Sequence, residues 1–264
     1  MSLQVFLQAQ ILGSEGFLAS FHSGENEAAD DLIGRCAWLT LIGEVLPRAL
    51  LAELKLSRML LGSSSAEQFL LVLPEEDSSR ANEFLMEAAA RIAQLSAGTL
   101  RLVWASTENL GSWPVVRKRI DDALASKICC PVPEERSNDL FAPFLPASPA
   151  NIESSFASLA AGLVSATSVG WATGDPILLT WDGGTFSWPL REQSSVEEDG
   201  ILFPRRIAVA EKDTSPAPLS ELAGRADGAE RWGILRGDVD HFEPQLRRAG
   251  SVEEHIHFSA LFKE

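Results

Sequence analysis

The sequence contains no tyrosine and only three cysteines, two of which are the adjacent Cys129 and Cys130. So few cysteines cannot form the disulfide framework of a small secreted domain, which favours a reducing compartment. No apolar run approaches the roughly 18 residues of a membrane-spanning helix, and the first twelve residues lack the positive start of a signal peptide. We therefore expect a cytoplasmic protein with no membrane partner.

Basic residues are scarce as well, because 22 Lys and Arg stand against 37 Asp and Glu, giving a net charge of −15. A free-standing nucleic-acid-binding protein usually carries a basic surface. Contact with nucleic acid would therefore have to come through local patches or other subunits. Arg117-Lys118-Arg119 and Arg247-Arg248 are such patches, although solvated helix faces explain both runs more simply.

The first 128 residues show the clearest periodicity. They predict strands at 4–12, 58–61, 68–73 and 99–105, with helices at 32–54 and 79–95. Along the chain the order is strand, helix, strand, strand, helix, strand, and a further helix follows at 114–127. Residues 17–21 would continue the first strand after a turn. This order is that of the ferredoxin-like split unit, with two helices on one face of a four-stranded antiparallel sheet. The same unit forms the core of the palm of polymerases and nucleotide cyclases.

The rest of the chain gives weaker signals. Five prolines within 128–150 indicate an extended connection, and a helix is expected at 151–166. The turn sequence Trp181-Asp182-Gly183-Gly184 predicts a hairpin between strands at 177–181 and 185–189. A strand at 231–240 and a helix at 252–263 close the sequence. A lone strand and helix would leave a sheet edge open, so we expect residues 228–264 to pack onto the first unit or to be poorly ordered.

The sharpest local feature is Asp238-Val239-Asp240 at the end of an apolar strand. Residues two apart on a strand point to the same face, so both carboxylates would project together. Such a pair can hold Mg²⁺ with triphosphate oxygens, and two such ions drive in-line displacement at phosphorus. A turn or a helix N-cap after the strand is the alternative reading of the same residues.

The stretch 238–242 resembles the first metal-binding strand of palm-type cyclases, including the GGDEF diguanylate cyclases. Their Lys and Asn-Asp continuation is replaced here by Glu243-Pro244-Gln245. The longer stretch 233–248, with 259–263, is more similar to the large palm-domain subunit of type III CRISPR effector complexes. The second palm of that family starts with a strand of the form Leu-(Lys/Arg)-x-Asp-Val-Asp.

Two earlier segments resemble the same family. Residues 32–39 are similar to the entry of its first palm helix, and 62–74 are similar to its glycine-rich hairpin. The final Phe69-Leu70-Leu71-Val72-Leu73-Pro74 of that hairpin is kept. Its glycines are replaced by serines, so the candidate nucleotide-binding residues are Gly62, Ser63, Ser64 and Ser65, for which a plain hairpin turn is the alternative.

The resemblance implies an α+β fold with a degenerate first palm at 1–128, a connector at 129–227 with a helix and a β-hairpin, and the start of a second palm at 228–264. It implies Mg-dependent (or Mn-dependent) synthesis of cyclic oligoadenylates from ATP when the complex finds target RNA. Asp238 would be the principal metal ligand and catalytic residue, with Asp240 supporting it. The implied partners are ATP, other CRISPR effector subunits, and guide and target RNA bound through the complex.

The sequence departs from this family in ways that leave its activity open. It lacks the His-Asp doublet of the N-terminal nuclease domain, and it stops at Glu264 before any Gly-Gly-Asp-Asp hairpin. We therefore expect a truncated chain that is inactive alone. One alternative is an inactive palm that acts as a binding or assembly module, and another is a regulatory domain of the diguanylate cyclase type. His255 and His257 do not share a helix face, so they are not expected to form a metal site.

Overall fold

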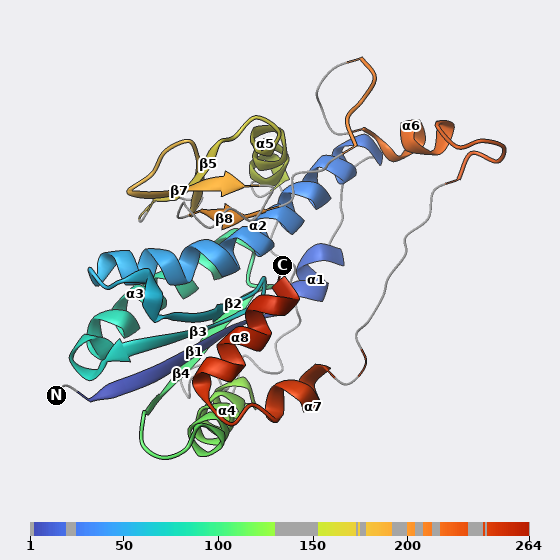
Figure 1. Cartoon of the computed structure of the whole chain (residues 1–264). Helices are drawn as coiled ribbons and strands as arrows, with labels where there is room; N and C mark the ends of the chain where they lie inside the picture. Colours follow the sequence, from blue (N-terminus) through green and yellow to red (C-terminus); the bar gives the residue numbers. More distant parts are fainter. Residues whose placement is uncertain are drawn as a thin grey trace, which may run out of the picture.

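The computed structural model describes residues 3–19, 25–129, 153–172, 174, 178–191, 200–203, 208–212, 217–231, 240 and 242–263. The fold is α+β, with two four-stranded sheets and helices packed around them (Figure 1). In this part of the chain, no helix has the length and apolar character needed to cross a lipid bilayer.

The main sheet has the strand order β2-β3-β1-β4, and all of its pairs are antiparallel. Its strands are β1 (Gln4–Leu12), β2 (Leu61–Ser64), β3 (Gln68–Pro74) and β4 (Arg101–Glu108). The helices α2 (Glu25–Glu53) and α3 (Ser78–Leu95) connect β1 to β2 and β3 to β4. This is the order and topology of the ferredoxin-like unit that the periodicity predicts.

One face of the main sheet is covered by α2 and α3, as expected. Strand residues alternate between the two faces, and the odd-numbered apolar residues of β1 and β3 point to these helices. With α2 and α3 they form the larger core of the molecule, which includes Leu7, Leu71, Trp38, Leu46 and Leu85. The helix expected at 79–95 is α3, and its apolar face is buried at Ala81, Phe84, Leu85, Ala88 and Ile92.

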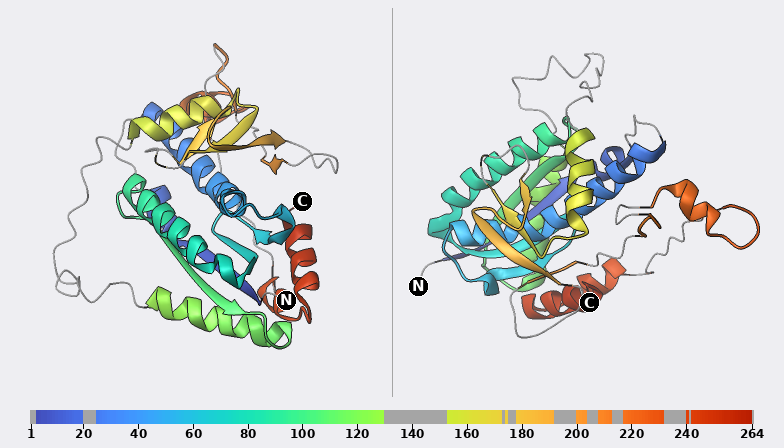
Figure 2. Two further views of the ribbon diagram at one scale, coloured as in Figure 1. Left: turned by 90° about the vertical axis from the view of Figure 1, so that its left-hand side faces the viewer. Right: turned by 90° about the horizontal axis from the view of Figure 1, so that it is seen from above.

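The opposite face of the main sheet is covered by α4 (Trp113–Cys129), with α7 (Phe242–Arg247) and α8 (Val252–Lys263) beside it (Figure 2). A smaller apolar cluster lies here, formed by Phe6, Leu70, Val103, Ala105, Trp113, Val116, Ile120, Leu124 and Ala249. Residues 246–255 therefore do pack on the first unit, which is one of the two outcomes expected for the end of the chain.

The second sheet lies on the outer side of α2, together with α5 (Glu153–Leu163). Its strands are β5 (Ser168–Trp171), β6 (Leu179–Trp181), β7 (Phe186–Arg191) and β8 (Ile201–Leu202). Helix α5 crosses α2 so closely that a Cβ at Gly34 would stand 1.8 Å from the Phe156 carbonyl oxygen. The Phe156 ring also meets Phe17 and Trp38 edge-on. The described part of the connector is thus built into the main core.

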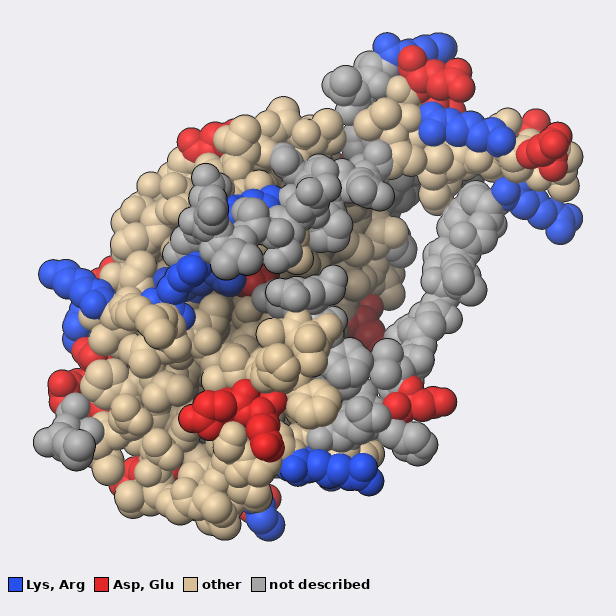
Figure 3. Space-filling view, viewed as in Figure 1, with Lys and Arg blue, Asp and Glu red and all other residues tan. Residues whose placement is uncertain are grey.

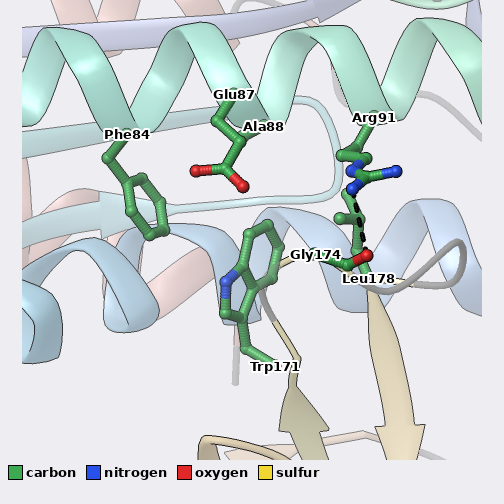
Figure 4. A pocket seen from close by; sticks show the side chains of 7 residues that line it. All are labelled: Phe84, Glu87, Ala88, Arg91, Trp171, Gly174 and Leu178. Atoms are coloured by element: carbon green, nitrogen blue, oxygen red, sulfur yellow. Dashed lines mark hydrogen bonds between the residues drawn. The ribbon is translucent and has the colours of Figure 1, made fainter.

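A second contact ties the small sheet to α3 (Figure 4). The rings of Phe84 and Trp171 stack with their centroids 5.5 Å apart. Beside them, a guanidinium N–H of Arg91 donates a 3.0 Å hydrogen bond to the carbonyl oxygen of Gly174. The depression between these residues leaves no space for a water molecule. It is therefore a packed seam rather than a binding site.

Three predictions about local structure are wrong. The strand expected at 58–61 is replaced at Arg58–Leu60 by a 3-10 helix, which begins where the Ser57 hydroxyl accepts a hydrogen bond from the Met59 N–H, so that β2 starts only at Leu61. The strand expected to resume at 17–21 is replaced by the helix α1 (Ser14–Ala19), which follows Gly13 at a φ of 91°. A Cβ at Gly13 would lie 2.1 Å from the Thr99 carbonyl oxygen, so only glycine allows the chain to turn there.

The hairpin expected around Asp182 is also wrong, because β6 and β7 each pair with β5 rather than with each other. The Asp182 carboxylate accepts hydrogen bonds from the hydroxyl of Thr167 and from the backbone N–H groups of Thr167 and Ser168, at the start of β5. These bonds lower the pKa of Asp182. The residue that was expected to make a two-strand turn instead holds the central strand of the sheet. The strand expected at 231–240 lies almost wholly outside the described residues, and α6 (Leu219–Gly224) precedes it.

Candidate functional site

A cavity of about 310 Å³ lies between the main sheet and the helices α4, α7 and α8. This volume is at the lower end of the range for small-ligand sites. The cavity is lined by Gln8, Ser63, Gln68, Phe69, Leu70, Trp113, Arg117, Asp121, Leu246, Arg247 and His255. Four separate parts of the chain therefore contribute to one open cavity.

The register of the sheet explains which strand residues reach this cavity. Ser63 is paired with Leu70, Leu70 with Gln8, and Gln8 with Ala105. Directly opposed residues point to the same face of a sheet, so this row runs across the face that α4 covers. The row places a hydroxyl and an amide on an otherwise apolar floor.

The four candidate nucleotide-binding residues of the hairpin are divided between different roles. Ser63 lines the cavity, whereas the hydroxyl of Ser64 points to the other face and donates a 3.1 Å hydrogen bond to Glu44 of α2. Ser65 closes the turn, because its backbone N–H donates to the carbonyl of Gln68 at 2.8 Å. Gly62 is buried at a register shift between β2 and β3. Only Ser63 of the four lines the cavity.

The opposite wall is formed by Trp113 and Arg117 of α4 and by His255 of α8. The Trp113 ring contacts Phe6 on the sheet and meets the His255 ring edge-on, with centroids 5.2 Å apart in each case. The Arg117 guanidinium donates hydrogen bonds to the backbone carbonyls of Leu246 at 2.8 Å and Arg247 at 3.1 Å. Arg117 therefore holds the end of α7 at the rim of the cavity.

His255 is the titratable group whose surroundings are most unusual here. Its Nδ1 is buried and accepts or donates no hydrogen bond within the described part of the chain. Burial lowers its pKa below the ordinary value of 6.5, and the positive charge of Arg117 lowers it further. The ring is consequently neutral at pH 7.

Most of the cavity residues were not singled out from the sequence. Gln8 and Gln10 interrupt the apolar pattern of β1 on one face, which is the signal that could have marked a polar floor. His255 was considered only as one of a metal-binding pair. Its role depends on α8 lying against α4, and nothing in the local sequence indicates that contact.

The basic run at 117–119 is largely used in packing. Arg117 binds α7, and Arg119 donates hydrogen bonds to the carbonyls of Glu108 and Leu110 before α4. Lys118 forms an exposed ion pair with Asp122. On the face that carries α7 and α8, acidic and basic side chains of the described residues lie in small separate groups (Figure 3). Among the described residues, this face therefore carries no broad basic patch.

The predicted metal and catalytic pair remains a prediction. Asp238 lies outside the described residues, and Asp240 is an exposed turn residue just before α7. Among the side chains that the structure describes, no three of His, Cys, Asp and Glu gather closely enough to hold a metal ion.

Comparisons by sequence found nothing: no protein-family model matches this chain, and no curated protein does. Comparison of structures gives a consistent result. A Csm1–Csm4 cassette in complex with one ATP matches with a TM-score of 0.71 and 16% identity, over 98% of this chain and 38% of that chain.

Two further structures agree with the first. The Csm1–Csm4 subcomplex of the type III-A CRISPR-Csm interference complex matches with a TM-score of 0.70 and 17% identity, over 98% and 38% of the two chains. Csm1 of T. onnurineus matches with a TM-score of 0.67 and 15% identity, over 98% and 36%. The chain thus has the fold of one part of Csm1 and spans little more than a third of the length of these structures. The expected resemblance to a type III CRISPR large subunit is confirmed at the level of the fold.

Proposed function

We propose that this chain is part of a large subunit of the Csm1 type in a type III CRISPR effector complex. The observation that carries the proposal is the structural match over 98% of the chain, at a TM-score of 0.71. It spans both sheets and not only the common ferredoxin-like unit, which hosts many unrelated functions. On this proposal the main sheet with α2 and α3 is the first palm.

The cavity on the second face of the main sheet is the proposed nucleotide site. Its volume suits a base and ribose with part of a phosphate chain, and Ser63 of the proposed nucleotide-binding hairpin lies in its wall. Trp113 offers an aromatic edge, while Arg117 and His255 offer N–H donors. A Csm1–Csm4 cassette has been solved with ATP, which supports ATP as the first ligand to test.

The parent reaction of the whole subunit would be Mg-dependent synthesis of cyclic oligoadenylates from ATP. Asp238 and Asp240 would hold the metal, because two carboxylates on one strand face supply the oxygen ligands that Mg²⁺ prefers. When bound, the metal would stabilise the charge that develops at phosphorus. The chain itself would position ATP on the floor formed by Ser63, Leu70 and Gln8. A Csm4-type subunit and RNA-bearing subunits would be its partners.

The test is ATP binding by the full chain, measured by isothermal titration calorimetry with and without Mg²⁺. Ser63→Phe fills the cavity and should abolish binding, whereas Ser64→Ala changes the other face and should leave it intact. Asp238→Ala should remove only the Mg-dependent part of the affinity. No binding of ATP, or equal binding by the Ser63→Phe variant, would overturn the proposed site.

The same experiment separates the two alternatives. ATP binding that is independent of Mg²⁺ and of Asp238 would assign the chain as an inactive palm that binds rather than reacts. Tighter binding of GTP than of ATP would favour a domain of the diguanylate cyclase type.

A further inference from the structure

Two lining residues of the cavity, Trp113 and His255, carry a buried ring nitrogen without a hydrogen-bond partner among the described residues, and His255 is the one of the two that titrates. Its Nδ1 is buried without a hydrogen-bond partner among the described residues, although its ring contacts Trp113. His255 also lines the cavity, so its ring lies within reach of a ligand in that space.

The charged groups around His255 favour an anion as that ligand. Arg117 of α4 and Arg247 of α7 line the same cavity, and Asp121 of α4 is the one acid among the lining residues. The residues that the sheet contributes, among them Gln8, Gln68 and Ser63, are uncharged. Two hydrogen bonds to carbonyls occupy only part of the five N–H groups of Arg117. The guanidinium therefore keeps donors for a second partner.

We propose that His255 and Arg117 together bind the phosphate part of the ligand in this cavity, and that binding draws a proton onto His255. The inference rests on the proposed nucleotide site and adds to it a binding residue and a regulation by pH. The imidazole is neutral in the free protein, because it is buried and stands near Arg117. A bound phosphate reverses this balance, since its negative charge favours the protonated ring.

The direction of the pH dependence follows from this balance. The pKa of His255 is low in the free protein and higher in the complex, so the complex binds more protons at intermediate pH. Affinity for a phosphate-bearing ligand therefore rises as the pH falls through the pKa of the complex, and levels off below the pKa of the free protein. A ligand without phosphate shows no such rise.

The experiment compares ATP with adenosine at pH 6 and pH 8, by calorimetry on the full chain in EDTA so that no metal contributes. We expect ATP to bind about tenfold more tightly at pH 6, because a pKa difference of one unit corresponds to a tenfold change in affinity. The matched variants are His255→Gln and His257→Gln, since His257 lies on the same helix and is exposed. Titration of ATP itself contributes equally in all three proteins, so His255→Gln should lose only the additional gain in affinity at pH 6 that the wild-type protein and His257→Gln share.

The outcomes distinguish this inference from the proposed function. Tight ATP binding with the same pH dependence in all three proteins would overturn the role of His255 and leave the site standing. Equal affinity for adenosine and ATP would mean that the phosphate lies outside the reach of His255 and Arg117. This outcome would also overturn the role of His255 and leave the nucleotide site standing. Failure of ATP to bind at either pH would overturn both.

A second measurement guards against a variant that merely disturbs α8. The chain has four histidines, so the ring C–H resonance of His255 can be assigned by nuclear magnetic resonance and followed against pH. ATP should raise the pKa of His255 by about one unit, as the tenfold affinity change requires, while adenosine leaves it unchanged. An unchanged pKa with saturating ATP would contradict the proposal.

Discussion

The two faces of the main sheet are built from the same strands but differ in how tightly they are packed. The face under α2 and α3 is closed by a continuous apolar core, in which Trp38, Leu46 and Leu71 have no exposed surface. The face under α4, α7 and α8 has a smaller apolar cluster and a cavity lined by polar groups. One face is packed throughout, and the other leaves an open cavity beside a smaller apolar cluster.

The alternation of a β-strand allows this division with few residues. Neighbouring positions such as Leu70 and Leu71, or Ser63 and Ser64, belong to opposite faces. A rigid and well-packed side is what positions a binding site on the other side. Substitutions at neighbouring positions should therefore have very different effects, and each prediction below tests this contrast.

The largest contrast is expected between Leu71→Ala and Leu70→Ala. Leu71 is fully buried in the larger core, and its truncation should lower the free energy of unfolding by about 4 kcal/mol. Leu70 lines an existing cavity, so fewer contacts are lost and the cost should be about 2 kcal/mol. Urea denaturation of both variants measures the difference. Equal losses would mean that the second face is packed as tightly as the first.

A buried ion pair on the packed side gives the next contrast. Nε of Arg35 lies 2.6 Å from a carboxylate oxygen of Asp31, and both side chains are less than a tenth exposed. The guanidinium also lies over the rings of Phe17 and Phe156. Asp31→Ala leaves this buried charge without its carboxylate and should cost about 3 kcal/mol.

The control for this prediction is the ion pair of Lys118 and Asp122, which has the same spacing on α4 but lies in solvent. Asp122→Ala should leave stability unchanged within error, because exposed pairs contribute little. The test compares the Tm of the Asp31→Ala and Asp122→Ala variants with that of the wild-type protein in thermal unfolding. A comparable shift of Tm in both would show that burial does not set the value of these pairs.

A smaller effect should separate the two serines of the hairpin. Ser64→Ala removes the hydrogen bond to Glu44 and should cost about 1 kcal/mol. Ser63→Ala removes a hydroxyl from the cavity wall, so stability should stay constant while ATP affinity falls. The prediction fails if the two alanine variants lose stability equally in urea.

The smallest effect concerns pH and the docking of α8. The pKa of His255 is lower in the folded protein than its ordinary value of 6.5. The contribution of His255 to the free energy of unfolding is therefore fully present above pH 6.5. It is lost as the pH falls from 6.5 through the pKa of His255 in the folded protein. The protection of the α8 amides against hydrogen exchange, relative to the intrinsic exchange rate at each pH, should fall below pH 6.5, while the protection of the α3 amides stays constant. His255→Gln should remove this difference between the helices.

The sequence predicts the packed face better than the cavity face, for a physical reason. The strands and helices of the main sheet follow from local periodicity, which is strongest where every second or fourth residue is buried. The helix expected at 79–95, for example, is found as α3 at Ser78–Leu95. The failures occurred where a single long-range contact decides the structure, as at Gly13 against Thr99 and at Asp182 against β5.

The candidate site was predicted only where a motif lies within one segment. Ser63 belongs to a hairpin that could be recognised by its sequence, and it does line the cavity. Arg117 of α4 lies far along the chain from Arg247 of α7 and His255 of α8, so no local pattern relates the three residues. The roles of Asp238 and Asp240 stay predictions, because Asp238 lies outside the described residues.

The contact between Gly34 and Phe156 has a consequence for how the chain folds. It joins segments that are far apart in the sequence, and the closure of such a long loop must be completed before the contact stabilises anything. Contacts of this kind raise the mean sequence separation between touching residues and slow folding. They also make α2 common to both sheets, so neither sheet can be lost without exposing the same helix. The main sheet and the small sheet should therefore unfold together, in one cooperative transition.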